Sequence, residues 1–245
     1  MSRKQPNPTA ETLRELEATG DRIADWASQN AALILGTIAA VLVLAAAIGL
    51  WVQHSSSERD AAADALALAT SDFRQAMGAD PLGGPIPEPA NPELGERTRT
   101  EYVERFVRVA EAHPDTAAGA VAWLEAGGLQ VELGRLEEAT RSFENARDAA
   151  RDSSIAALAW TRIAGLAEGG GDHLAAAQAY EAAAAIDAYP LRASALASAA
   201  RCWDLAERPD EALSAFQRLE TQFPDEAVAP DVEARMAELR SSAGR

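Results

Sequence analysis

Cysteine, lysine and strand-forming residues are scarce in this chain. Cys202 is the only cysteine, which excludes an intrachain disulfide and also a lipoprotein, whose modified cysteine would directly follow a signal sequence. Lys4 is the only lysine, and aromatic residues make up 5% of the chain. β-Branched residues are sparse outside one apolar run, whereas alanine, which has the highest helix propensity, is abundant. This composition predicts an all-α protein, with Cys202 as a small buried residue.

Positive charge is also in short supply. The chain has 22 basic against 38 acidic residues, a net charge of −16, and almost all of the excess lies after residue 30. A body this acidic repels the phosphates of nucleic acids and the headgroups of anionic lipids. We therefore expect no nucleic-acid partner.

The residue patterns typical of catalytic and metal sites are lacking as well. His54, His113 and His173 lie far apart in the sequence, and none has a carboxylate or cysteine at ligand spacing. The glycine run 169–171 is followed by no lysine and joins two predicted helices, so it indicates a turn and not a phosphate-binding loop. No serine, cysteine and histidine constellation for nucleophilic catalysis is visible. We expect neither an enzyme nor a cofactor.

One long apolar run predicts a transmembrane helix. Residues 31–52 contain no charge, and as a helix they would span roughly 33 Å, close to the thickness of a bilayer core. Trp26 and Trp51 flank the run and are predicted to anchor it at the two membrane interfaces. The run is longer than the apolar part of a usual signal peptide, although small residues at 55–63 leave cleavage open. Residues 1–30 form a short segment before the helix.

The distribution of basic residues around this run predicts its orientation. Four basic residues precede it, whereas only Arg59 and Arg74 follow it closely. This bias favours a cytoplasmic N-terminus. We expect a single-pass protein of the bacterial inner membrane with its C-terminal domain in the periplasm.

The segments after the run differ sharply in composition. Residues 53–77 have apolar residues at helical spacing and predict a membrane-proximal helix. Residues 78–97 contain five prolines and four glycines, which predict an extended loop. We interpret this loop as a linker, with a polyproline-II ligand as the alternative. Residues 227–245 predict a capping helix and a tail.

Residues 98–226 repeat themselves with a period of 36 or 37 residues. Trp123 recurs as Trp160, and Phe143 recurs as Tyr180, each 37 residues later. A third copy follows with Phe216. Alanines recur around each of these aromatic residues: Ala139, Ala146, Ala176, Ala183 and Ala212.

This pattern resembles the tetratricopeptide repeat, a helical hairpin of about 34 residues with a tryptophan early in its first helix and an alanine and an aromatic residue in its second. The copies lie at 120–153, 157–190 and 193–226, and an incomplete repeat precedes them. Small residues such as Gly127 let the two helices approach closely, and large ones such as Phe143 fill the gap between repeats. The resemblance implies an α-solenoid of about three to four hairpins.

In the tetratricopeptide fold, the first helix of each repeat lines a concave groove that binds a partner. The resemblance places twelve residues there: Val121, Leu124, Gly128, Val131, Glu132, Leu158, Thr161, Gly165, Glu168, Ala197, Arg201 and Asp204. The lysine and asparagine pairs with which some family members clamp a terminal carboxylate are missing. A mildly apolar groove edged by carboxylates indicates an apolar or basic partner segment. The alternative for each residue is ordinary solvated surface.

The order of segments resembles one family in particular, the YfgM-type membrane-anchored tetratricopeptide proteins, which are ancillary subunits of the SecYEG translocon. The likeness rests on GLWVQHSSSERDAAADALALA and HPDTAAGAVAWLEAGGLQVELGRLEEA. It implies a protein-binding scaffold or holdase that meets the translocon or exported chains. An adaptor of an envelope assembly or cell-division complex is the alternative. The proline-rich loop and the longer acidic leader depart from the pattern of that family.

Overall fold

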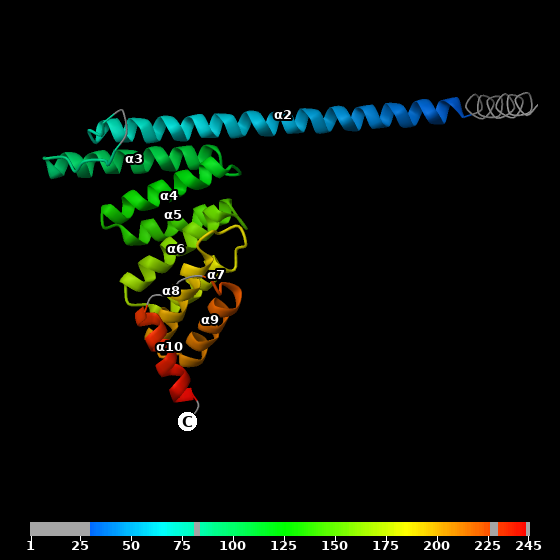
Figure 1. Ribbon diagram of the computed structural model, residues 1–245. Helices are drawn as coiled ribbons and strands as arrows, with labels where there is room; N and C mark the ends of the chain where they lie inside the picture. Colours follow the sequence, from blue (N-terminus) through cyan, green and yellow to red (C-terminus); the bar gives the residue numbers. More distant parts are fainter. Residues whose placement is uncertain (1–29, 81–83, 226–229, 244–245) are drawn as a thin grey trace, which may run out of the picture. The chain divides into compact units, whose positions relative to one another are not determined.

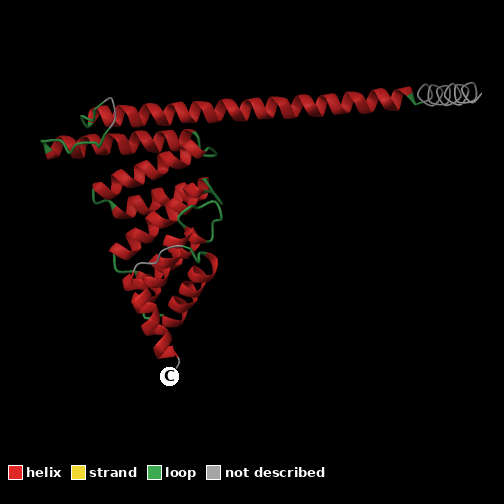
Figure 2. Cartoon of the chain, viewed as in Figure 1, coloured by secondary structure: helices red, strands yellow, loops and turns green. Residues whose placement is uncertain are grey.

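The computed structural model describes residues 30–80, 84–225 and 230–243, and these form helices and loops without a strand (Figures 1 and 2). The side chains of residues 31–42, 51–52, 230–231 and 242–243 lie outside the description. The chain divides into two compact units, Met1–Ser57 and Glu58–Arg245. The predicted all-α class is confirmed for the described residues.

The first described helix, α2, runs from Ala31 to Ala76 and contains the predicted transmembrane segment. Four large apolar side chains of that segment are described, and each is 60 to 70% exposed: Val43, Leu44, Ile48 and Leu50. Within the described residues, no helix has the length and hydropathy required to cross a bilayer. Most of the 31–52 run lies outside the described side chains, so the transmembrane helix stays a prediction. The predicted interface anchors, Trp26 and the Trp51 side chain, lie outside the description too.

The C-terminal part of α2 packs against α3, which spans Pro92–Ala112. The Phe73 ring lies 5.3 Å from Tyr102 and 6.4 Å from Phe106, measured between ring centroids. Together the two helices form a hairpin ahead of the three clearer repeats. Helix α3 starts six residues before the predicted start of the repeats because Asn91 caps it, accepting a hydrogen bond of 3.0 Å from the Glu93 amide, and proline is tolerated in the first helical position.

Three further hairpins follow in chain order, and consecutive helices pack side by side (Figure 1). They are α4 (Ala117–Glu132) with α5 (Leu136–Ala149), α6 (Ser154–Gly169) with α7 (His173–Ala184), and α8 (Arg192–Leu205) with α9 (Pro209–Gln222). Helix α10 (Pro230–Ala243) covers the last hairpin with Met236 and Leu239.

The turn inside each hairpin uses one residue in the left-handed backbone region. Gly134 has φ 73° and Gly171 has φ 82°, both favourable because glycine has no Cβ. The glycine run 169–171 therefore ends α6 and forms this turn. In the third hairpin the equivalent residue is Glu207, with φ 59°, which strains the backbone.

The hairpin cores alternate small and large residues, as the repeat pattern predicts. Ala139 and Ala146 are fully buried beside Phe143, and Gly127 faces the Phe143 ring from the other helix. Cys202 is also fully buried, and burial raises the pKa of its thiol to about 11. The thiol therefore stays protonated at neutral pH and packs as an apolar group.

Candidate functional site: a groove on the first helices

The predicted groove residues lie on α4, α6 and α8, and the first two of these helices are in contact. Val131 is 38% and Leu158 36% exposed. Gly165 is exposed and Gly128 half-buried, and a Cβ added to either would meet no atom within 4 Å. Each of the two glycines thus leaves open space over its own helix. Val121, Leu124, Thr161 and Ala197 are half-buried.

The three predicted carboxylates occupy the last turns of α4, α6 and α8, and they recur every 36 residues. Each accepts hydrogen bonds from an arginine of another helix. Arg99 Nε lies 2.6 Å from Glu132, and Arg201 holds Glu168 with two nitrogens at 2.5 and 3.0 Å. These two carboxylates are thus engaged in ion pairs between hairpins, and the Glu132 side chain remains 55% exposed.

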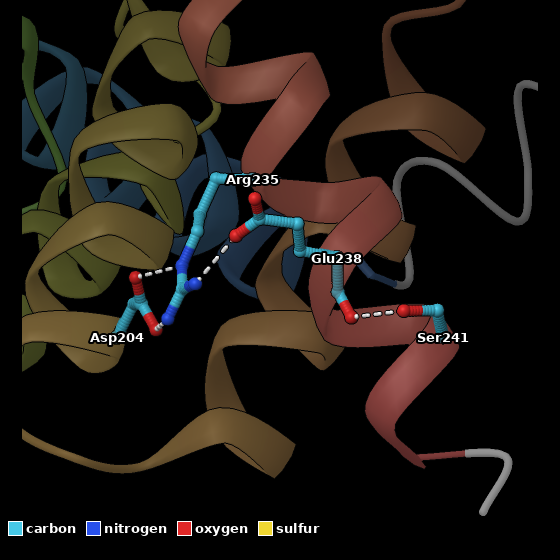
Figure 3. A network of polar contacts seen from close by, with 4 residues as sticks. All are labelled: Asp204, Arg235, Glu238 and Ser241. Carbon is cyan, nitrogen blue, oxygen red and sulfur yellow. Dashed lines mark hydrogen bonds and ion pairs between the residues drawn. The ribbon is translucent and has the colours of Figure 1, made fainter.

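The third carboxylate, Asp204, joins α8 to the capping helix (Figure 3). Arg235 donates to both of its oxygens, through Nε at 2.8 Å and Nη2 at 2.9 Å. The same guanidinium donates to Glu238 at 2.7 Å, one turn along α10. A two-pronged contact of this kind fixes geometry better than a single ion pair does.

Glu168 is the centre of a small polar network between α6, α7 and α8. The hydrogen bonds from Arg201 hold the pKa of Glu168 below its usual range. Tyr180 donates a longer hydrogen bond of 3.3 Å to the same carboxylate, and burial raises the pKa of Tyr180 to about 12. Arg201, which we predicted as a groove residue, is therefore a structural partner of Glu168.

Two charged residues belong to this face although the repeat alignment did not select them. Glu125 lies next to Leu124 on α4, and Arg162 lies next to Thr161 on α6; both are exposed. Burial nevertheless raises the pKa of Glu125, opposed by the nearby charge of Arg162. The helical position of Glu125 next to a selected residue was the only signal in the sequence.

A hollow of about 470 Å³ adjoins Glu132 at the first hairpin. Its lining includes Phe73 of α2, Met77 directly after that helix, Ile86 and Pro87 of the proline-rich loop, and Arg99 of α3. No group of three or more potential metal ligands gathers in the part of the chain that the structure describes.

Comparison with known families gives an independent test of the repeat pattern. A family model described as a tetratricopeptide repeat-like domain matches residues 24–241. A comparison with curated proteins finds no match. The matched region includes every described hairpin and the face on α4, α6 and α8. The chain belongs to the tetratricopeptide repeat-like domain family.

Proposed function

We propose that this protein is a membrane-anchored scaffold or holdase of the bacterial envelope, accessory to the protein-secretion translocon. Tetratricopeptide repeat-like domains generally bind other proteins, so a protein partner follows from the family. The observation that carries the proposal is the accessible face of α4 and α6, where Val131 and Leu158 are exposed and where Gly128 and Gly165 leave open space over their helices.

The same face suggests the chemistry of the partner. Exposed aliphatic side chains favour an apolar segment, and the exposed carboxylate of Glu125 adds a negative charge that the nearby Arg162 partly balances. An exported chain that has not folded presents apolar segments with occasional basic residues. A groove of this kind would hold such a segment weakly, and confinement near the membrane would raise the local concentration of both partners.

Site-specific photocrosslinking in native membranes tests this function. A crosslinker at Leu158 should capture a translocon subunit or an exported chain, whereas one at Leu191, which is exposed but lies at the start of α8, should not. Capture of an envelope-assembly or division protein at Leu158 would favour the alternative adaptor function. Equal capture at both positions would refute the groove.

A charge introduced at Leu158 provides the matched variant. Leu158→Glu should reduce capture by the groove several-fold and leave the melting temperature within about 2 °C, because the side chain is already partly exposed. Leu191→Glu is the control and should leave both unchanged. Loss of capture together with a large fall in melting temperature would mean that Leu158 is a core residue.

The predicted topology has its own test. Protease added to spheroplasts should digest residues 60–245 and leave the N-terminal segment protected. The opposite pattern would place the repeat domain in the cytoplasm and remove the translocon's periplasmic side as the meeting point.

A further inference from the structure

The proline-rich loop after α2 is fastened to the first hairpin by one arginine. Arg99 of α3 is only 13% exposed, and its Nη1 and Nη2 donate to the two carboxylate oxygens of Glu88, the Nη1–Oε1 distance being 3.2 Å. Its Nε donates to Glu132 at 2.6 Å. Glu132 of α4 thus orients the guanidinium, whose two terminal nitrogens face the loop. Arginine recognises a carboxylate most specifically through such a bidentate contact.

Other contacts hold the loop on both sides of Glu88. Arg74, in the last turn of α2, donates to the Gly84 carbonyl at 2.8 Å. A Cβ on Gly95 would lie 2.9 Å from Arg99 Nη1 and 3.5 Å from Pro89, so the glycine leaves room for the loop to approach α3. A loop that acted only as a linker would require none of these contacts.

The loop covers a surface that it does not fill. The hollow of about 470 Å³ lies between Ile86 and Pro87 on the loop side and Phe73 and Met77 on the helix side. Residues 84–88 are themselves exposed, and Ile86 is 38% accessible. This loop segment is therefore peripheral and is held by only a few contacts, so another peptide could replace it.

We propose that the joint of α2, α3 and α4 is a second peptide-binding surface, specific for an extended segment with a carboxylate between two prolines, and that residues 85–89 (PIPEP) occupy it as a tethered ligand. Proline keeps such a segment extended at low entropic cost, and Arg99 reads the carboxylate. A partner carrying the same chemistry would exchange with the loop. This surface is separate from the face on α4 and α6 and stands without it.

The proposal sets a bound on affinity. A segment tethered by a short flexible connection has an effective concentration on the order of millimolar, so the loop stays seated only if the free peptide binds with a Kd of about 1 mM or tighter. The untethered peptide should therefore bind measurably once the loop is removed, and more weakly while the loop is in place.

The test uses the full chain with residues 85–89 replaced by Gly-Ser-Gly-Ser-Gly, which keeps the Asn91 cap. The probe is the blocked peptide of residues 84–91, titrated while the backbone ¹⁵N–¹H resonances of α3 are followed, a readout that the Arg99 and Arg97 variants also offer. We expect saturation with a Kd of about 1 mM or tighter in the replaced protein, and at least severalfold weaker binding in the wild type. Failure to bind the replaced protein at 10 times that concentration, with its melting temperature unchanged, would overturn the proposal.

Matched variants separate specific recognition of the carboxylate from non-specific peptide binding. The peptide with Glu88→Gln and the protein with Arg99→Gln should each weaken binding about tenfold or more, because each removes a charged two-pronged hydrogen bond. Arg97→Gln, exposed on the same helix, should change nothing. Equal binding by the Arg99 and Arg97 variants would refute the role of the arginine.

A second measurement covers the case in which the replaced loop disturbs folding. Glu88→Gln in the otherwise unchanged chain should increase the backbone mobility of Ile86 and Ala90, measured by their ¹⁵N heteronuclear NOE, and leave helicity intact. Unchanged mobility would show that Glu88 does not seat the loop, which contradicts the proposal. A wild-type dimer that dissociates when the loop is replaced would assign the surface to a second copy of the chain and also overturn it.

Discussion

Two adjacent glycines on α4 should respond in opposite ways to the same substitution. Gly127 faces α5, and a Cβ built there would lie 2.7 Å from Cδ1 of Phe143 and closer still to Cε1. Phe143 is 2% exposed and has no room to withdraw. Gly128 lies one position along the same helix, and a Cβ there would meet nothing within 4 Å.

The magnitudes follow from two opposing effects. Replacing glycine by alanine inside a helix stabilises it by about 1 kcal/mol, because alanine loses less backbone entropy on folding. Overpacking a close-packed core costs about 1–3 kcal/mol, and the short approach to Phe143 places Gly127 at the upper end of that range. Gly127→Ala should therefore destabilise the protein by about 2 kcal/mol, and Gly128→Ala should stabilise it by about 1 kcal/mol.

Thermal and urea unfolding of the two variants check this difference. For a domain of this size, melting should fall by roughly 4–8 °C for Gly127→Ala and rise by roughly 2–4 °C for Gly128→Ala. Helix propensity alone would raise both melting temperatures, so a rise in both would refute the close packing of α4 on Phe143. A fall in both would show that the space over Gly128 is filled.

Three further predictions concern the turn, the polar network and the buried thiol. Glu207→Gly should stabilise the third hairpin by about 1 kcal/mol in urea unfolding, because it relieves the left-handed backbone at that turn, whereas Gly171→Ala should cost a similar amount. The pKa of Glu168 is lowered below its ordinary 4.5, so its pairing with Arg201 stabilises the folded state above that pH and is lost as the pH falls through the folded value. The stability difference between wild type and Glu168→Gln should accordingly be present at pH 7 and vanish in strong acid; a constant difference across pH would contradict the pairing. Cys202, buried and with its pKa raised to about 11, should react with iodoacetamide at pH 8 only after urea is added, and rapid reaction without urea would show that the stack opens readily.

The repeat architecture could be predicted from the sequence because its signals are local. The spacing of Phe143 from Ala139 and Ala146 lies within one helix, and the 37-residue displacement to Tyr180 identifies the next copy. Burial of these positions depends on that spacing alone. The predicted register therefore agrees with the structure at the cores of the hairpins.

The chemistry of the groove was harder to predict from the sequence because it depends on pairs of residues from different repeats. Glu132, Glu168 and Asp204 have the helical positions of a groove rim, and a single-repeat pattern does not reveal that arginines 31 to 33 residues away neutralise them. The predicted groove residues include Leu124 but not its neighbour Glu125. The contact of Arg99 with the proline-rich loop could not be predicted for the same reason. Composition predicts an extended chain there but does not predict its contacts.

The recurring ion pairs also show where the stack is weakest. Glu168 pairs with Arg201 of the next hairpin. The position that corresponds to Arg201 in the preceding repeat is Gly165, which cannot form an ion pair with Glu132. Glu132 instead pairs with Arg99 of the preceding hairpin. Among the described residues, no ion pair joins α4 or α5 to α6 or α7.

The apolar clusters divide at the same joint, one drawing on α2, α3 and α4 and the others on α6 to α10. In a linear array of repeats, each interface contributes separately to cooperativity. The joint between α5 and α6 is spanned by Arg147 over the Trp160 ring, 4.6 Å from its centroid, but by no ion pair among the described residues, so we expect this joint to form a seam. We expect hydrogen exchange to resolve two cooperative blocks on either side of the turn between α5 and α6. Under load, the domain would then part at that seam before either block unfolds.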